Sequence, residues 1–207
     1  MNGKRYYVKK SSKDFVQRGI ASWYGNKFHG RRTSNGETYD MYAMSAAHKT
    51  LPLPTYLEVV NLKNGRKVIV RVNDRGPFHE NRIIDLSYTA AAKLGIVKTG
   101  TGLVEIRAIN PGTYKKGGAP VRTAAIDTVS SGFYIQVGSF SSILNAKNLR
   151  KKLGPLGSGL IHISKAVLHG STVYRVRIGP IQDIDFADRI VTGLGRYGIT
   201  EHHIVFD

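Results

Sequence analysis

Three carboxylates and one histidine in the first half of the chain lie beside turn-forming residues. Glu37 follows an Asn-Gly pair, Asp74 begins an Asp-Arg-Gly-Pro turn, and Asp85 and His48 lie in neighbouring polar segments. Carboxylates and imidazoles are the side chains that most often transfer protons in enzymes. Where strands end in turns, side chains from distant segments converge on one site. The pattern therefore indicates an acid–base site, while the same spacing also fits ordinary turns, a solvated carboxylate and a structural histidine.

The chain has 207 residues, with 31 Lys and Arg against 14 Asp and Glu, so its formal net charge is +17. This length allows one large domain or two small ones. A surface so basic attracts anions such as nucleic acid, anionic lipid or an acidic glycan. The sequence contains no cysteine, which excludes disulfides, thiolate metal ligands and cysteine nucleophiles. No apolar run approaches the roughly 18 residues of a membrane span.

A stretch rich in turn-forming residues over 111–130 predicts a linker between two domains. Residues 1–18 form a basic arm that we expect to be solvated, and residues 19–110 form the first domain. This domain contains several short β-like runs and one short helix, with Ser87 as its cap and Gly95 as its end. Such a composition predicts a small barrel. The expected strands cover 19–24, 56–62, 67–73 and 103–110, with an Asn-Gly hairpin between the second and the third.

Residues 131–207 follow the order strand, helix, strand, strand, helix, strand. This βαββαβ order predicts an α+β ferredoxin-like domain with both helices on one face of the sheet. Strand alternation places Gln136, Arg175 and Arg177 on the open face, where arginines either bind an anion or keep the surface soluble. The expected strands cover 133–140, 162–168, 173–178 and 201–206. The first expected helix begins after Ser141 or Ser142 and ends near residue 153. The second begins after Asp183 or Asp185 and ends near residue 196.

Five motifs of the first domain resemble the double-psi β-barrel of the rare lipoprotein A family. They are GIASWYG (19–25), TSNGETYD (33–40), AAHKTLP (46–52), VNDRGPF (72–78) and RIIDLS (82–87). The second domain resembles a sporulation-related repeat (SPOR) domain through FYIQVGSF (133–140) and YRVRIGP (174–180). The resemblance implies an all-β, six-stranded double-psi β-barrel over 19–110, followed by an α+β ferredoxin-like (βαββαβ) SPOR domain over 131–207.

The rare lipoprotein A family includes endolytic peptidoglycan lytic transglycosylases, which cut the bond between N-acetylmuramic acid and N-acetylglucosamine and leave 1,6-anhydro ends. The resemblance implies a catalytic site of Glu37, His48 and Asp74. The C6 hydroxyl of the muramic acid serves as an intramolecular nucleophile, so no attacking water is needed. We expect Asp74 to protonate the glycosidic oxygen and then to accept the C6 hydroxyl proton, while Glu37 stabilises the oxocarbenium charge; the reverse assignment stays open. His48 is expected to position a carboxylate or a sugar hydroxyl.

Three further residues are reserve candidates. Asp85 lies in an Asp-Leu-Ser motif like one that bears a functional acid in expansins and family 45 endoglucanases, and it also suits a helix cap. Trp23 and Tyr24 suit either a stacking surface for a sugar ring or the core. SPOR domains bind glycan strands stripped of their stem peptides, so the resemblance implies targeting to such denuded strands. The expected glycan contacts, suited to lactyl carboxylates, are Gln136, Ser139, Arg175 and Arg177.

A non-catalytic, expansin-like wall-binding protein is the main alternative to an enzyme. Nucleic-acid binding is not expected, because no strand carries the aromatic pattern of an RNA-recognition module. The histidine spacing predicts no metal site, and no motif indicates a cofactor. We expect a monomer that acts on peptidoglycan glycan strands in the periplasm. Since the chain has neither an export signal nor a cysteine, we also expect a native precursor whose leader makes it an outer-membrane lipoprotein.

Overall fold

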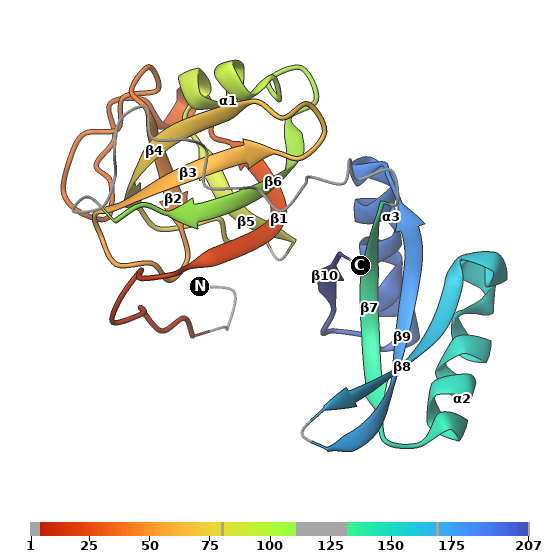
Figure 1. The fold of residues 1–207 in the computed structure, drawn as a ribbon. Helices are drawn as coiled ribbons and strands as arrows, with labels where there is room; N and C mark the ends of the chain where they lie inside the picture. Colours follow the sequence, from red (N-terminus) through yellow and green to blue (C-terminus); the bar gives the residue numbers. More distant parts are fainter. Residues whose placement is uncertain (1–4, 80, 111–131, 169, 207) are drawn as a thin grey trace. The chain divides into compact units, whose positions relative to one another are not determined.

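The computed structural model describes residues 5–79, 81–110, 132–168 and 170–206. The chain divides into two compact units, Met1–Val129 and Ser130–Asp207, and each is described by itself (Figure 1). The expected linker over 111–130 lies outside the described residues. Within the described part of the chain, every helix is too short or too polar to cross a bilayer.

The first unit is a closed six-stranded barrel with the strand order β1-β5-β2-β4-β3-β6 (Figure 1). Two neighbouring pairs, β1 with β5 and β2 with β4, are parallel, and the other pairs are antiparallel. The all-β, six-stranded double-psi barrel expected from the motifs is therefore confirmed. Its strands are β1 (Val16–Trp23), β2 (Ser45–His48), β3 (Thr55–Asn61), β4 (Lys67–Asp74), β5 (Arg82–Leu86) and β6 (Thr101–Ala108).

Alternating apolar residues build the core of this barrel. In β4, Val68, Val70 and Val72 are buried, whereas Ile69 between them is exposed. Alternate residues of a strand point to opposite faces, so one face of each strand fills the barrel and the other faces outward. The hairpin between β3 and β4 turns through Gly65, whose φ of 71° is a conformation that glycine adopts at little cost. The predicted Asn-Gly hairpin is confirmed.

Two barrel strands and one strand boundary differ from the sequence predictions. β2 and β5 were not predicted, because they have only four and five residues and mix polar with apolar side chains. β1 begins at Val16 rather than at residue 19, and Val16 pairs with Arg107 of β6. The arm that we expected to be solvated also contacts the barrel, since Lys9 N donates to the carbonyl of Thr50 at 2.7 Å. The end of the arm therefore belongs to the folded unit.

One short helix, α1 (Tyr88–Leu94), packs against the barrel (Figure 1). Ser87 caps it, because its hydroxyl accepts a hydrogen bond from Ala90 N at 3.3 Å and donates to the carbonyl of Ala43 at 2.6 Å. Gly95 ends the helix in the left-handed conformation with φ 77°. Both predicted ends of this helix are confirmed. A single turn of 3₁₀ helix, η1 (Asn26–Phe28), lies in the loop between β1 and β2.

The second unit is a four-stranded antiparallel sheet with the order β10-β7-β9-β8 (Figure 1). Both helices pack on the sheet face that carries the buried residues Ile135, Val176 and Ile178. The predicted ferredoxin-like βαββαβ fold is confirmed. Its elements are β7 (Phe133–Phe140), α2 (Ile143–Leu153), β8 (Ile161–Leu168), β9 (Ser171–Ile181), α3 (Ile184–Leu194) and β10 (His203–Val205), with 3₁₀ turns at Gly154–Leu156, Ser158–Leu160 and Gly195–Tyr197.

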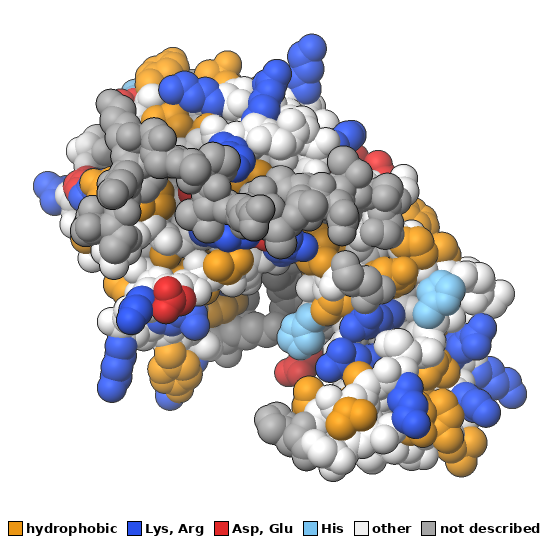
Figure 2. Space-filling view, in the orientation of Figure 1, with side chains coloured by type: hydrophobic (Ala, Val, Ile, Leu, Met, Phe, Trp, Pro, Cys, Tyr) orange, Lys and Arg blue, Asp and Glu red, His pale blue; other side chains and the backbone are white. Residues whose placement is uncertain are grey.

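Two helix caps, one helix end and the extent of one strand in this unit resolve or correct the predictions. Ser142 caps α2 through Leu144 N, and Asp183, not Asp185, caps α3 through Phe186 N. α3 ends at Leu194 rather than near 196, because a 3₁₀ turn follows it. β10 covers only His203–Val205, which is shorter than the expected 201–206. Lys and Arg side chains spread over both units on the face drawn in Figure 2, as the net charge of +17 requires.

Candidate active site

Four residues lie in register across four neighbouring strands of the barrel. Ser22 of β1 pairs with Asp85 of β5, Asp85 pairs with Ala47 of β2, and Ala47 pairs with Asp74 of β4. Residues in register on adjacent strands point to the same face of the sheet. Their chain neighbours in β1, β2 and β5 belong to the hydrophobic core, so this carboxylate row (Ser22, Asp85, Ala47 and Asp74) faces outward. Two of the predicted acids therefore share one face.

The turn after β4 folds back over the carboxylate row. Gly76 has a φ of 143°, and a Cβ there would lie 3.6 Å from Ala47 Cβ and 3.9 Å from Asp85 Oδ2. These distances leave room for a Cβ, so the positive φ, which other residues rarely adopt, is what favours glycine at this position. Arg75 holds the turn in place by donating from Nη1 to the carbonyl of Leu51 at 2.5 Å. The turn thus lies against the middle of the row, at Ala47 and Asp85.

A bulge in β4 orients the polar side chains next to Asp74. The register between β2 and β4 shifts at Asn73, which is an extra residue opposite β2. A bulge bends its strand and redirects side chains, and bulges are common beside active sites. Arg71 and Asn73 both reach Glu37, so they point away from the core that Val70 and Val72 fill. β4 therefore contributes three polar side chains on its outer side, those of Arg71, Asn73 and Asp74.

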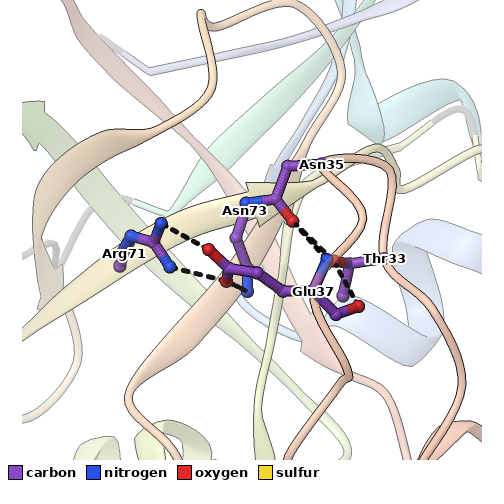
Figure 3. A network of polar contacts seen from close by, with 5 residues as sticks. All are labelled: Thr33, Asn35, Glu37, Arg71 and Asn73. Carbon is purple, nitrogen blue, oxygen red and sulfur yellow. Dashed lines mark hydrogen bonds and ion pairs between the residues drawn. The ribbon is translucent and has the colours of Figure 1, made fainter.

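Glu37 is held by a network of hydrogen bonds at the tip of the loop between β1 and β2 (Figure 3). Arg71 donates from both terminal nitrogens to the two carboxylate oxygens at 2.6 Å each, and Asn73 Nδ2 donates to Oε2 at 3.0 Å. The backbone is fixed as well, since Glu37 N donates to Asn35 Oδ1 at 3.2 Å and Thr33 Oγ1 donates to the carbonyl of Glu37 at 3.0 Å. The bidentate pair gives the carboxylate one orientation.

These contacts also decide the charge of Glu37. The hydrogen bonds from Arg71, followed by that from Asn73, lower its pKa from 4.5 to about 2. Donors to the charged form favour ionisation, and the adjacent positive charge adds to this effect. Glu37 is therefore a carboxylate at neutral pH and holds no proton to donate. Its side chain is 40% exposed, so the charge is accessible from solvent.

Asp74 is tied to the same loop as Glu37. Its Oδ1 accepts hydrogen bonds from Ser34 N at 2.8 Å, Ser34 Oγ at 2.6 Å and Arg75 N at 2.8 Å. Ser34 lies three residues before Glu37, so one loop spans both carboxylates while β4 supplies their partners. The structure therefore brings Glu37 and Asp74 together, with different environments: an ion pair around the first and neutral donors around the second.

Asp85 lies deeper on the carboxylate row than Asp74. Its Oδ1 accepts a short hydrogen bond from the Ser22 hydroxyl, and Arg82 Nη1 donates to the same hydroxyl at 3.1 Å. Burial raises the pKa of Asp85, while Ser22 and the cations Arg82, His79 and Lys49 oppose that rise. The net direction favours the protonated carboxyl. The environment is that of an acid rather than that of a plain helix cap, and Ser87 fills the cap position.

His48 lies on the opposite side of β2 from the carboxylate row. It pairs with the core residue Ile84 and is 3% exposed. Its Nδ1 accepts hydrogen bonds from Thr50 N at 3.2 Å and Leu51 N at 3.1 Å, and its Nε2 lies 3.5 Å from Gln17 Oε1. Burial, followed by nearby cations, lowers the pKa of His48 to about 4. In the described part of the chain, no hydrogen bond joins this neutral imidazole to Glu37 or to the row.

The two reserve aromatics belong to a cluster beside the site. Trp23 is partly buried against the core, and its ring contacts Tyr88 at 5.6 Å between centroids. The ring of Tyr24 packs between Tyr39, at 4.2 Å, and Phe28, at 6.1 Å. Such edge and tilted contacts stabilise packed aromatic clusters. Both rings therefore contribute to the wall of the barrel. The sequence had left open whether they belong to the core or contact a sugar ring.

Several partners of the carboxylates were missed in the sequence analysis. Each of them donates a hydrogen bond to one of the three carboxyl groups. They are Ser22, Ser34, Arg71 and Asn73. Alternation along β4 contained a signal for Arg71, since it lies between two buried valines. Nothing in the local sequence indicated Ser34, because its contact with Asp74 spans 40 residues.

The open face of the second unit carries a row of cationic and amide side chains. His203 of β10 pairs with Gln136 of β7, Gln136 pairs with Arg177 of β9, and Arg177 pairs with His162 of β8. Arg177 Nε donates to Gln136 Oε1 at 3.5 Å, so these side chains lie on one face. Below this cationic row (His203, Gln136, Arg177 and His162), the predicted residues Ser139 and Arg175 also pair with each other. The structure adds the two histidines to the predicted set.

No group of three or more His, Asp or Glu side chains is close enough to hold a metal ion among residues 5–79, 81–110, 132–168 and 170–206. The fold and the site together define a double-psi barrel with an outward carboxylate site, joined to a ferredoxin-like SPOR domain.

Comparison with known proteins identifies the family. The profile described as "Lytic transglycolase" matches residues 16–106, and the SPOR domain profile matches residues 129–198. The chain belongs to the rare lipoprotein A family. It is 38% identical to the endolytic peptidoglycan transglycosylase RlpA of Pseudomonas aeruginosa over 90% of this chain and 70% of that protein. The protein of the same description from Vibrio cholerae is 44% identical over 92% of this chain and 69% of that protein.

Among solved structures, the SPOR domain of RlpA from Pseudomonas aeruginosa aligns with 37% of this chain and 100% of its own, with 29% identity and a TM-score of 0.35. The family resemblance read from the motifs of both domains is thus confirmed by the family profiles and the relatives.

Proposed function

We propose that this protein is an endolytic peptidoglycan lytic transglycosylase, which cleaves the bond between N-acetylmuramic acid and N-acetylglucosamine and forms 1,6-anhydro ends. One observation carries the proposal: a single loop spans two carboxyl groups that have different hydrogen-bond partners. Glu37 is fixed as a carboxylate by Arg71, while Asp74 is held by neutral donors. Enzymes that cleave glycosides separate acid and charge-stabilising roles between two carboxyl groups in this way.

In the proposed mechanism Asp74 moves the proton. Its Oδ1 is engaged by three donors, so the transferable proton is assigned to Oδ2. As the bond between C1 and the glycosidic oxygen breaks, Asp74 protonates that oxygen and becomes a carboxylate. The C6 hydroxyl oxygen then bonds to C1, and Asp74 accepts the hydroxyl proton and is restored. Because nucleophile and electrophile belong to one sugar, the second step is intramolecular and needs no water.

Glu37 stabilises the positive charge that develops on the sugar ring. A carboxylate that is already oriented by Arg71 and Asn73 needs no rearrangement when the charge appears. Its low pKa keeps it ionised at neutral pH. The reverse assignment of roles is disfavoured, because Glu37 at a pKa of about 2 is a poor source of a proton near neutral pH.

Asp85 is the second candidate for the acid. Burial raises its pKa, and it lies on the same row as Asp74. In that assignment Asp74 would act as the base. His48 is proposed as a positioning residue, because its Nδ1 holds the backbone of Thr50 and Leu51, and the Leu51 carbonyl in turn binds Arg75 beside Asp74.

The SPOR domain is proposed to direct the barrel to denuded glycan strands. Removal of a stem peptide leaves a lactyl carboxylate on the muramic acid, and a guanidinium group binds a carboxylate through two parallel hydrogen bonds. Arg177 and Arg175 lie on the open sheet face beside Gln136 and Ser139, where they face solvent only in part. Gln136 adds an amide that can pair with a sugar hydroxyl.

Mass spectrometry of fragments released from purified sacculi tests the proposal. The wild-type protein should release anhydro-ended glycans, and Asp74→Asn and Glu37→Gln should release almost none. Comparing Asp74→Asn with Asp85→Asn identifies the acid, since only loss of the acid spares substrates with an activated leaving group. A need for prior amidase treatment supports denuded strands as the substrate. Retention on sacculi without any release would favour the non-catalytic, expansin-like alternative.

As a member of this family, the protein works in the cell envelope on the peptidoglycan layer. We propose further that it acts as a monomer and that a lipid anchor holds its native form to the outer membrane. The family relationship supports an envelope location. Intact-mass analysis of protein isolated from its source should reveal the acyl chains, and a mass without lipid would contradict the anchor.

A further inference from the structure

The N-terminal arm contacts the barrel at the edge of the candidate active site (Figure 1). Lys9 N donates to the carbonyl of Thr50 at 2.7 Å, just beyond the end of β2. Earlier in the arm, the ring of Tyr6 packs on that of Phe78, with 6.4 Å between the centroids and an angle of 60° between the planes. Phe78 follows Gly76 in the turn that lies against the carboxylate row. The site therefore has a neighbour that comes from outside the barrel strands.

Phe78 connects Tyr6 to the carboxylate row. A Cβ at Gly76 would lie 3.9 Å from Asp85 Oδ2 and 4.0 Å from Phe78 Cε2, so the edge of the Phe78 ring lies close to this carboxyl group. Tyr6 adds a second ring to the same surface. Its side chain is 37% exposed, and that of Phe78 is only partly buried. This aromatic pair (Tyr6 and Phe78) is thus an accessible apolar surface beside the groups proposed for acid–base chemistry.

A lysine joins the arm to the turn at the aromatic pair. Lys49 Nζ lies 5.9 Å from the centre of the Tyr6 ring and donates to the carbonyl of His79 at 3.2 Å. An ammonium group has three N–H donors, so it can bind a carbonyl, face an aromatic ring and still accept an anion. The arm adds four more basic side chains and no carboxylate over residues 5–13. The surface around the aromatic pair is therefore cationic.

Aromatic rings next to a cation suit a sugar that carries a carboxylate. The C–H groups on one face of a pyranose ring form an apolar surface that packs on an aromatic ring, while the sugar hydroxyls stay in water. An ammonium group binds a carboxylate through a charge-assisted hydrogen bond. In peptidoglycan, N-acetylmuramic acid has both features once its stem peptide is removed, because the lactyl group is then a free carboxylate.

We propose that Tyr6, Phe78 and Lys49 form a subsite for one N-acetylmuramic acid of the glycan strand. Tyr6 packs on the sugar ring, and Lys49 binds the free lactyl carboxylate. The inference rests on the proposed function, because it assigns a further binding site for the same substrate beside the same carboxyl groups. A strand that is cleaved in its interior extends beyond the scissile bond on both sides, and the aromatic pair borders the row on one of them. The family profile matches residues 16–106, so Tyr6 lies outside it.

An amide NMR titration of the full chain with the disaccharide N-acetylglucosaminyl-N-acetylmuramic acid tests the subsite without catalysis. This disaccharide carries one lactyl carboxylate and lacks the bond that the enzyme is proposed to cleave. The amide signals of Tyr6, Lys49 and Phe78 should shift with one common dissociation constant, which is measured separately from that of the SPOR domain. Tyr6→Ala should weaken this binding about tenfold, whereas Tyr6→Phe should keep it, because packing needs the ring and not the hydroxyl. Tyr7→Ala is the matched control, since Tyr7 is the next residue of the arm and is 78% exposed.

Chitobiose, which has the same two rings without the lactyl group, tests the role of Lys49. The subsite should bind it about tenfold more weakly than the disaccharide with the carboxylate, and Lys49→Gln should abolish that difference. Lys93→Gln, which removes a positive charge from α1, should preserve it. Equal affinity of the wild type for both sugars, or a preference that persists in Lys49→Gln, would contradict carboxylate binding by Lys49.

Turnover on short soluble glycans separates a binding role from a structural one. Tyr6→Ala should raise KM about tenfold and leave kcat unchanged, because a contact made equally in the ground state and the transition state changes only KM. Unshifted amides at Tyr6 and Phe78, or an affinity that Tyr6→Ala leaves unchanged, would overturn the inference even if the protein cleaves sacculi. Faster turnover in Tyr6→Ala would also overturn it, since the arm would then obstruct the site. If the disaccharide binds as expected while the wild type releases no anhydro fragments, the proposed catalysis fails and the subsite stands.

Discussion

The barrel and the SPOR domain each present one row of polar side chains across four strands, and the two rows are built differently. The carboxylate row runs over β1, β5, β2 and β4 and is covered by the turn at Gly76. The cationic row runs over β10, β7, β9 and β8 on an open sheet face. One row is enclosed by backbone and loops, whereas the other has no described segment packed over it.

The difference matches the roles that we propose for the two rows, which are acid–base catalysis for the first and glycan binding for the second. Burial raises the pKa of Asp85, whereas the hydrogen bonds from Arg71 and Asn73 of β4 lower the pKa of Glu37. Acid–base chemistry needs groups whose protonation states are separated in this way. Recognition of a long anionic strand needs accessible donors instead, and enclosure would exclude the strand. The same ladder geometry thus suits the catalysis that we propose for one unit and the glycan binding that we propose for the other.

The largest expected effect separates these two roles. Asp74→Asn should lower turnover on short soluble glycans by about 10²- to 10⁴-fold, because it removes the group that transfers the proton. Retention on sacculi should not change, since the SPOR face is intact. Glu58→Gln in β3 is the control, because it removes one negative charge from the barrel away from the row. Anhydro-product formation and sacculus pull-down measure both properties, and loss of retention in Asp74→Asn would contradict the division of roles.

Arg71→Met should alter the enclosed site through Glu37. Without the bidentate partner, the pKa of Glu37 should rise from about 2 towards 4.5. Because Glu37 must be ionised, the ascending limb of the pH–rate profile should move up by about two pH units, and activity at acidic pH should fall by up to about 100-fold. Lys67→Met, which removes a positive charge from the same strand, should leave the limb in place. A profile identical to the wild type would show that Glu37 is not the group that must ionise.

Arg177→Ala tests the open row. It should weaken binding to amidase-treated sacculi by about 10- to 100-fold, which corresponds to the loss of a charge-assisted hydrogen bond. Turnover on short soluble glycans should be unaffected. Arg189→Ala is the matched control, because Arg189 lies on α3 over the ring of Phe186 on the helix side of the sheet. Equal losses in both variants would mean that net charge, rather than this face, provides the binding.

The neutral state of buried His48 predicts a pH dependence of stability. An unfolded histidine takes up a proton below about pH 6.5, whereas folded His48 does so only near 4. The unfolded state therefore binds more protons in this window, and the free energy of unfolding decreases as the pH falls through it. Between about pH 7 and 5 the wild type should lose about 2 kcal/mol more than His48→Gln. Urea unfolding at both pH values measures this, and equal losses would contradict the low pKa.

The smallest expected effect compares the helix caps of the two units. Ser87 is fully buried and makes two hydrogen bonds, so Ser87→Ala should lower the free energy of unfolding by about 2 kcal/mol. Ser142 caps an exposed helix end with one bond, so Ser142→Ala should cost about 0.5–1 kcal/mol. Chemical denaturation that resolves the two units measures both. A larger loss for Ser142→Ala would show that burial does not govern the cap energy here.

Much of the fold was predictable from local patterns. Alternation identified β3, β4, β6 and β7 to within about two residues, and Ser87 with Gly95 marked both ends of α1. β2 and β5 were missed because short strands that mix polar and apolar residues carry little local signal. Their polar residues include His48 and Asp85, so two of the predicted site residues lie on strands that local patterns did not identify, whereas Asp74 ends the predicted strand β4.

The sequence by itself determined which residue types are available for chemistry, the order of the elements in the second unit and both ends of α1. These features depend on neighbours within a few residues along the chain. Only the tertiary structure decided which residues meet. Parallel pairing of β2 with β4 and antiparallel pairing of β2 with β5 place Asp74 and Asp85 on either side of Ala47 and turn His48 towards the core. The physical reason is that register between distant strands and a one-residue bulge set the direction of each side chain, and neither is encoded locally.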